Sequence, residues 1–134
     1  MCAAASASPR GRSEAAYEVV LLPAAAEDFR LLPSHALKLQ AMEYLAQIEA
    51  KPHFAPLLEN HRIWGDLSDC RRIYLDETHD HDPRWRIIYR LLPTDAEPTH
   101  AEVIIIGPRR DDEVYVRIME RLGRPLGPEH PAGG

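Results

Sequence analysis

Cysteine is scarce in this chain, which excludes a fold held together by disulfide bonds. The 134 residues include two cysteines, Cys2 and Cys70, and two cannot form the framework that stabilises small secreted domains. Stability must therefore come from an apolar core, for which a hydrophobic content of 45% is ordinary. We expect such a chain in a reducing compartment, the cytoplasm.

Long apolar runs are also missing. No stretch approaches the roughly 20 residues that a membrane-spanning helix needs, and residues 1–15 lack the apolar centre of a secretory signal. We predict no contact with a membrane. The expected organisation is a disordered N-terminal extension over residues 1–15, one domain over residues 16–123 and a flexible tail over residues 124–134.

Lysine is rare as well. Lys38 and Lys51 are the lysines among 16 basic residues, so the other 14 are arginines, and the formal net charge is −5. This acidic balance argues against a general nucleic-acid binder, whose surface is usually basic. Heavy use of arginine can reflect genome composition alone, but composition does not explain where these arginines fall.

The arginines fall in phase with two strand-like segments. Side chains alternate between the faces of a strand, and in residues 84–92 apolar or aromatic residues largely alternate with Arg84, Arg86 and Arg90. In the preceding segment Arg72 shares a face with Tyr74. Several guanidinium groups on one sheet face predict a site for a polyanion, most simply a phosphate backbone.

Hydrophobic periodicity predicts an α+β domain. The expected elements are a strand at 17–22, helices at 24–32 and 34–50, strands at 67–75, 84–92 and 102–107, and a helix at 111–122. Short polar connections between the last three strands favour antiparallel pairing, and Val103–Ile106 is expected to form a central strand covered on both faces. We predict a small antiparallel sheet of about four strands, an N-terminal helical hairpin on one face, a C-terminal helix, and the other face open to solvent.

This order of elements and three local motifs resemble the RelE/ParE superfamily, the toxic halves of bacterial type II toxin–antitoxin pairs. The motifs are Leu67–Ile73 (LSDCRRI), Trp85–Tyr89 (WRIIY) and Gly107–Tyr115 (GPRRDDEVY). RelE-like members cleave mRNA in the ribosomal A site, whereas ParE-like members inhibit DNA gyrase without nuclease chemistry. The resemblance favours the RelE-like branch, an endoribonuclease that uses no cofactor or metal and drives attack of the RNA 2′-hydroxyl on the adjacent phosphate.

The resemblance also implies a set of site residues. It places Arg72, Arg86 and Arg109 at the catalytic, phosphate-contacting positions. Tyr115 falls where RelE-like enzymes keep a tyrosine thought to act as the base, which would require neighbouring cations to stabilise its phenolate form. Further contacts to substrate phosphates are expected from Arg84, Arg90 and Tyr74.

The chain departs from the family pattern at two positions. Tyr74 stands where several ribosome-dependent members carry lysine, and Pro108 replaces a residue that is often basic. Together with the acidic net charge, these departures leave two alternatives open: a gyrase-binding toxin of the ParE type, or a relative that binds partners without being toxic.

Plainer interpretations of the same residues also stay open. Arg86 fits a solvated strand position, Arg109 fits an ion pair with a neighbouring aspartate, and Tyr115 fits a core aromatic. The acidic loop His79–Asp82 is not expected to bind a metal, since no second ligand pair accompanies it. We expect one protein partner, a cognate antitoxin that orders on binding and covers the helical face and the last helix.

Overall fold

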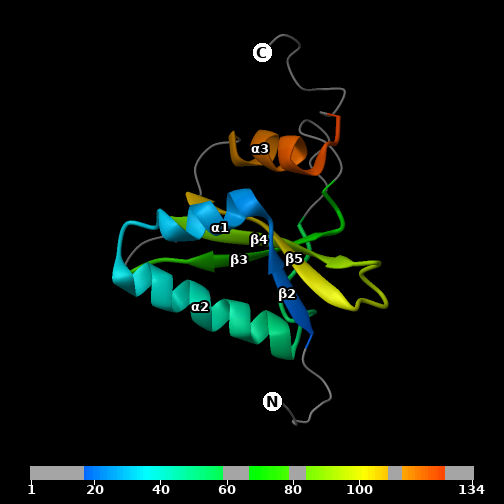
Figure 1. Cartoon of the computed structure of the whole chain (residues 1–134), viewed down its shortest axis with the longest axis horizontal. Helices are drawn as coiled ribbons and strands as arrows, with labels where there is room; N and C mark the ends of the chain where they lie inside the picture. The colour runs from blue at the N-terminus through cyan, green and yellow to red at the C-terminus, as the bar shows by residue number, and fades with distance from the viewer. Residues whose placement is uncertain (1–16, 59–66, 79–83, 109–112, 126–134) are drawn as a thin grey trace.

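The computed structural model describes residues 17–58, 67–78, 84–108 and 113–125. The elements are β2 (Glu18–Leu21), α1 (Pro23–Arg30), α2 (His35–Ala50), β3 (Cys70–Leu75), β4 (Trp85–Leu92), β5 (His100–Pro108) and α3 (Glu113–Leu122) (Figure 1). Their types and order are those expected from the sequence, with small shifts at the ends. None of the described helices is long and apolar enough to cross a membrane.

The two N-terminal helices begin and end where the sequence signals predict. Pro23 occupies the first position of α1, where its missing N–H is not needed. The Oγ atom of Ser34 accepts a hydrogen bond from Leu37 N at 3.1 Å and so caps α2. The α2 helix ends at Ala50, before Lys51 and Pro52.

The sheet has the strand order β2-β5-β4-β3. The β3, β4 and β5 strands form the expected antiparallel meander. The expectation of a wholly antiparallel sheet is wrong, however, because β2 pairs with β5 in parallel, with Val19 opposite Ala101. The short connections that favour antiparallel pairing join only the last three strands. A helical hairpin follows β2, so no short connection fixes its direction.

Apolar side chains cover both faces of the sheet. Ile87 and Tyr89 of β4 belong to the core beneath α1 and α2, whereas Ile88, which points the other way, belongs to a second core with Ile118 and Met119 of α3. The prediction that one face stays open is therefore wrong over the part that α3 covers. The reason is that α3 is amphipathic and buries its apolar side against the few apolar residues of that face.

The central strand β5 contributes to both cores, as predicted. Its register against β4 shifts between Ile88 and Tyr89, which leaves Ile104 as an extra residue in β5. As a result Ile104 and Ile105 both lie in the core beneath α3, and Val103 lies in the core beneath the other two helices.

Candidate active site

Arg86 stands at the centre of the face that α3 partly covers. It lies on β4 between two strands, opposite Tyr74 of β3 and Gly107 of β5. Residues opposite each other on neighbouring strands share a face, and Gly107 adds no side chain beside the guanidinium. The side chain is nonetheless enclosed, because Arg86 is 5% exposed. The alternative interpretation of Arg86 as a solvated strand residue is therefore wrong.

Two tyrosines surround this buried guanidinium. Arg86 Nη1 donates a hydrogen bond to Tyr115 Oη at 2.8 Å. The guanidinium carbon lies 5.3 Å from the ring centroid of Tyr115 and 5.6 Å from that of Tyr74, distances at which a cation is attracted to an aromatic face. Tyr115 comes from α3 and Tyr74 from β3, so the site joins a helix to the outer part of the sheet.

The charge of Arg86 is not balanced by a carboxylate anywhere in the part of the chain that the structure describes. Its Nε is buried and has no hydrogen-bond partner there. A buried charge without a counter-ion costs stability, and such costs are typical of functional sites. The arrangement is suited to receiving an anion.

Arg72 joins the same cluster from β3. Its guanidinium carbon lies 5.3 Å from the ring centroid of Tyr74, so the Tyr74 ring is flanked by Arg72 and Arg86. Arg72 Nη1 donates to the carbonyl of Leu57 at 3.2 Å, while its Nε is buried without a partner among the described residues. Of the seven predicted site residues, four come together: Arg72, Tyr74, Arg86 and Tyr115.

Arg84 and Arg90 are engaged with carboxylates. Arg84 Nε lies 3.2 Å from Asp76 Oδ2, and this hydrogen bond holds the pKa of the Asp76 carboxyl well below its usual range. Arg90 Nε lies 2.8 Å from Glu102 Oε1. Either arginine would have to leave its carboxylate to bind a substrate phosphate, so their roles stay predictions.

Arg109, the remaining predicted site residue, lies outside the described residues, as do its neighbouring aspartates and the loop His79–Asp82. The last residue of β5 is Pro108, which pairs with Trp85 of β4, while Gly107 pairs with Arg86. The catalytic role of Arg109 stays a prediction.

The position of Tyr115 depends on two ion pairs that sequence reasoning did not find. Arg121 Nη1 of α3 donates to Asp28 Oδ2 at 2.7 Å and to the carbonyl of Ile104 at 2.8 Å. The same Asp28 oxygen accepts from Ile106 N at 3.1 Å. The pair thus occupies the edge of β5 just past the end of β2, and it attaches α3 to α1.

The second pair lies beyond the C-terminal end of α3. Arg124 donates to both carboxylate oxygens of Asp69, at 2.9 and 2.8 Å, and this hydrogen bonding lowers the pKa of Asp69. Next to it Cys70 is buried, and burial raises the pKa of its thiol to about 12, so this cysteine is not a nucleophile. Neither pair leaves a local sequence signal, because its members are far apart in the chain.

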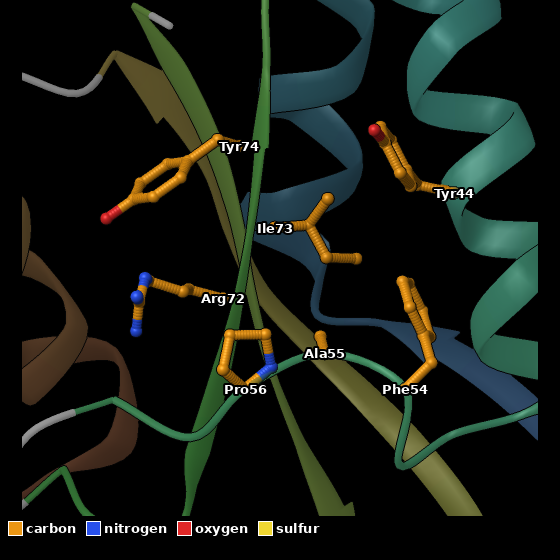
Figure 2. A pocket seen from close by; sticks show the side chains of 7 residues that line it. All are labelled: Tyr44, Phe54, Ala55, Pro56, Arg72, Ile73 and Tyr74. Atoms are coloured by element: carbon orange, nitrogen blue, oxygen red, sulfur yellow. The ribbon is translucent and has the colours of Figure 1, made fainter. Parts of the chain in front are cut away.

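A pocket of about 250 Å³ adjoins the site at the outer edge of β3 (Figure 2). It was not expected from the sequence. Arg72 and Tyr74 point to one side of β3, toward α3, whereas Tyr44 of α2 and Phe54 stand on the other side. The lining residues are Tyr44, Phe54, Ala55, Pro56, Arg72, Ile73 and Tyr74.

The chemistry of the cluster follows from its groups. Guanidinium groups bind phosphate oxygens through several directed N–H donors, and a phenol can accept or donate a proton. No cluster of three or more metal-ligating side chains occurs within residues 17–58, 67–78, 84–108 and 113–125. Two guanidinium groups and two phenols lie together on the face that α3 partly covers, and groups of these kinds can bind a phosphate and move a proton beside it.

Solved structures share the architecture of this chain. An arginine-to-alanine double mutant of the E. coli toxin RelE in the free state matches 81% of this chain and 99% of its own, with a TM-score of 0.58 and 21% identity. The chain has the RelE fold. No family model and no curated protein matches the sequence.

Two further matches are structures of toxin–antitoxin complexes. The intact E. coli RelBE toxin–antitoxin complex matches with a TM-score of 0.52 at 19% identity, over 72% of this chain and 100% of that chain. The RelBE2 toxin–antitoxin complex of Mycobacterium tuberculosis matches with a TM-score of 0.50 at 18% identity, over 74% and 98%. At these identities the likeness establishes the fold.

Proposed function

We propose that this chain is the toxin of a toxin–antitoxin module and that it acts as an endoribonuclease on mRNA associated with the ribosome. The observation that carries the proposal is Arg86, a buried cation placed between two tyrosine rings and hydrogen-bonded to Tyr115 Oη. The RelE fold supports it, since solved structures of that fold are toxins in complex with antitoxins.

In the proposed reaction the RNA 2′-hydroxyl attacks the adjacent phosphorus and the 5′-oxygen leaves, giving a 2′,3′-cyclic phosphate. Arg86 and Arg72 bind the phosphate oxygens and stabilise the negative charge that grows on them. In the proposed step Tyr115 acts in its phenolate form and takes the 2′-hydroxyl proton, its Oη oriented by the hydrogen bond from Arg86 Nη1, and the leaving 5′-oxygen takes a proton from water. Arg109 is proposed to stabilise the leaving oxygen. The attacking hydroxyl is already held beside its phosphate and the guanidinium groups supply positive charge, so we propose that no metal is needed.

Substitution at the two central residues tests the proposal. Arg86→Ala and Tyr115→Phe are each expected to abolish growth arrest on induction and to lower the rate of mRNA cleavage by at least a hundredfold. Tyr115→Phe keeps the ring and removes the hydroxyl. Arg30→Ala, at an exposed ion pair on α1, is the matched control and is expected to behave as wild type. Full growth arrest by both variants would refute the nuclease proposal.

The acidic net charge of −5 supports an alternative, inhibition of DNA gyrase through surface contacts. A net-negative chain is less favoured at an RNA surface than at a protein target. In that case induction inhibits supercoiling and leaves mRNA intact, and Arg86→Ala retains toxicity. Measuring supercoiling and mRNA integrity in the same induced cells separates the two activities.

An antitoxin is the proposed partner, and α2 offers it an apolar surface. Leu39 is 47% exposed and Met42 is 55% exposed, and residues three apart on a helix share a face. Leu31, at the end of α1, is 68% exposed. Exposed apolar side chains grouped in this way are typical of a surface that a partner covers. We infer that the antitoxin docks on this side of the helical hairpin.

A further inference from the structure

We propose that the pocket at the outer edge of β3 binds the nucleobase of a nucleotide whose phosphate is held by Arg72 and Arg86. The inference rests on the proposed function, because it takes the ligand of the arginine cluster to be RNA. It adds a subsite that is made of different residues, principally Tyr44 and Phe54, and it makes the site select a base as well as a phosphate.

The pocket has walls suited to a flat ring. Tyr44 and Phe54 present aromatic rings from α2 and from the segment that follows it, and Pro56 adds a third apolar ring. Phe54 is 39% exposed, so its ring is accessible without any rearrangement. Stacking of a base on an aromatic side chain is the usual way in which proteins bind single-stranded RNA.

The volume also fits one ring system. A cavity of about 250 Å³ is smaller than the roughly 300–1,000 Å³ that drug-sized ligands occupy. Its size is therefore that of a small ligand such as a single base.

Arg72 connects the pocket to the anion site. It lines the pocket while its guanidinium stacks beside Tyr74 in the arginine cluster. Its Nε is buried without a partner among the described residues, so a ligand would contact the terminal nitrogens of the guanidinium, of which Nη1 also donates to the Leu57 carbonyl. A ligand that places an anion at the guanidinium and a flat apolar group around the edge of β3 is a nucleotide.

The segment that forms the floor of the pocket is held firmly in place. Arg71, 8% exposed, donates to the carbonyls of His53 and Ala55 at 3.2 and 2.6 Å and pairs with Asp95 at 2.7 Å. Arg72 N donates to the Pro56 carbonyl at 3.1 Å. The floor is therefore preorganised, which lowers the cost of ordering it when a ligand binds.

The test measures binding of fluorescently labelled short single-stranded RNA to the full chain by anisotropy. One RNA is intact, and in the others a single abasic ribose, which keeps the phosphate and removes the base, is moved along the strand. We expect Phe54→Ala to weaken binding of intact RNA about tenfold, the typical worth of one stacked base. We expect the RNA with one particular abasic position to bind wild type more weakly than intact RNA does, to the same extent. For that RNA, Phe54→Ala should lower the affinity no further.

Two control variants accompany this measurement. Val20→Ala, at a residue of matched exposure (38%) on the opposite edge of the sheet, is expected to bind all RNAs as wild type does. Phe54→Trp keeps a ring for stacking and is expected to retain affinity for intact RNA.

Three outcomes would overturn the pocket assignment. The first is equal affinity of Phe54→Ala and wild type for intact RNA, and the second is an equal loss for intact and every abasic RNA. The third is a loss of antitoxin binding by Phe54→Ala with RNA binding unchanged, which would assign the pocket to a peptide side chain.

The cleavage assay tests the proposed function independently of the binding measurement, which tests the pocket assignment. If the wild-type chain leaves mRNA intact while Phe54→Ala loses base-dependent affinity for RNA, the nuclease proposal fails and the pocket assignment stands. If Arg86→Ala loses cleavage and Phe54→Ala binds normally, the pocket assignment fails alone.

Discussion

At the scale of single residues, two buried arginines on neighbouring strands show that the groups around an arginine decide whether it is structural or can bind a ligand. Arg71 is 8% exposed and Arg86 is 5% exposed. Arg71 is bound by Asp95 and by two backbone carbonyls, so its charge is compensated and it holds a loop in place. Arg86 has aromatic rings and a phenol oxygen around it instead. Only the second keeps binding capacity for a ligand.

Replacing each arginine by methionine is expected to change stability in opposite directions. Arg86→Met removes a buried charge for which residues 17–58, 67–78, 84–108 and 113–125 hold no carboxylate partner, so we expect the free energy of unfolding to rise by about 1–2 kcal/mol. Arg71→Met leaves Asp95 and two carbonyls without their donor, and we expect a loss of about 3 kcal/mol. Chemical denaturation of both variants measures these changes in the free energy of unfolding. A fall in stability for Arg86→Met would contradict the argument that the buried charge of Arg86 destabilises the fold.

At the scale of elements, the position of α3 decides whether the cluster forms. Tyr115 is the contribution of α3 to the site, and the helix is attached to the body through its apolar face and through two ion pairs. The Asp28–Arg121 pair is partly buried, with 20% and 17% of the side chains exposed. It binds an N–H and a C=O group of β5 where β2 no longer covers that edge.

We therefore expect Asp28→Ala to destabilise the fold by about 2–3 kcal/mol, because it leaves Arg121 and the Ile106 N–H without their acceptor. Glu27→Ala, one residue away, breaks only an exposed pair with Arg30, and we expect a change below about 1 kcal/mol. Chemical denaturation gives both values, and amide hydrogen exchange in α3 reports its attachment. Equal effects of the two substitutions would contradict the role assigned to the partly buried pair.

The connection between β3 and β4 provides a pH-dependent contact. Asp76 accepts from the backbone N–H groups of Glu77 and Arg84 at 2.6 and 2.7 Å, and from Arg84 Nε. Arg84 and these N–H groups lower the carboxyl pKa from an ordinary value of 3.8. A lowered folded-state pKa contributes stability at pH values above the unfolded-state pKa, and that contribution is lost as the pH falls through the folded-state pKa.

Asp76→Asn is accordingly expected to lower the free energy of unfolding at neutral pH. The difference between wild type and variant should shrink as the pH falls below about 4. Denaturation curves collected from neutral pH into the acid range measure this difference. A gap that stays constant over that range would show that the carboxylate charge is not what stabilises the connection.

At the scale of the whole molecule, charge and exposed apolar surface are divided between different regions. The net charge is −5, yet Arg72 and Arg86 gather on the face partly covered by α3, and exposed Leu39 and Met42 lie on α2. Figure 1 shows α2 and α3 as separate helices on different sides of the sheet. One molecule can therefore present separate surfaces to a substrate and to a protein partner.

We expect the double substitution Leu39→Glu and Met42→Glu to abolish co-purification with the antitoxin when both proteins are expressed from the native gene pair. Charges on the exposed side of α2 would oppose burial of that surface by the proposed antitoxin. The helix itself should persist, because glutamate is a good helix former and both positions are exposed. RNA cleavage by the purified variant should match wild type, and a variant that still co-purifies would place the antitoxin elsewhere.

The local sequence determined the elements and the faces of the strands. Pro23 and Ser34 mark helix starts, and the alternation along β4 separates Ile87 from Arg86. These features depend on neighbours within a few residues, so they can be derived from the chain alone. The resemblance to RelE-like toxins supplied the expected roles of Arg72, Arg86 and Tyr115, and alternation alone did not distinguish them from Arg84 or Arg90.

Only the tertiary structure decided which arginines keep an unpaired charge. Among the described residues, Arg84 and Arg90 have carboxylates within reach and Arg86 does not, because the partners come from other strands and from residues that the fold brings close. Tertiary contacts also decided three other features. These are the parallel direction of β2, the position of α3 over the sheet face that carries Arg86, and the pocket at Tyr44 and Phe54. Each depends on contacts between residues far apart in the chain, which local periodicity does not encode.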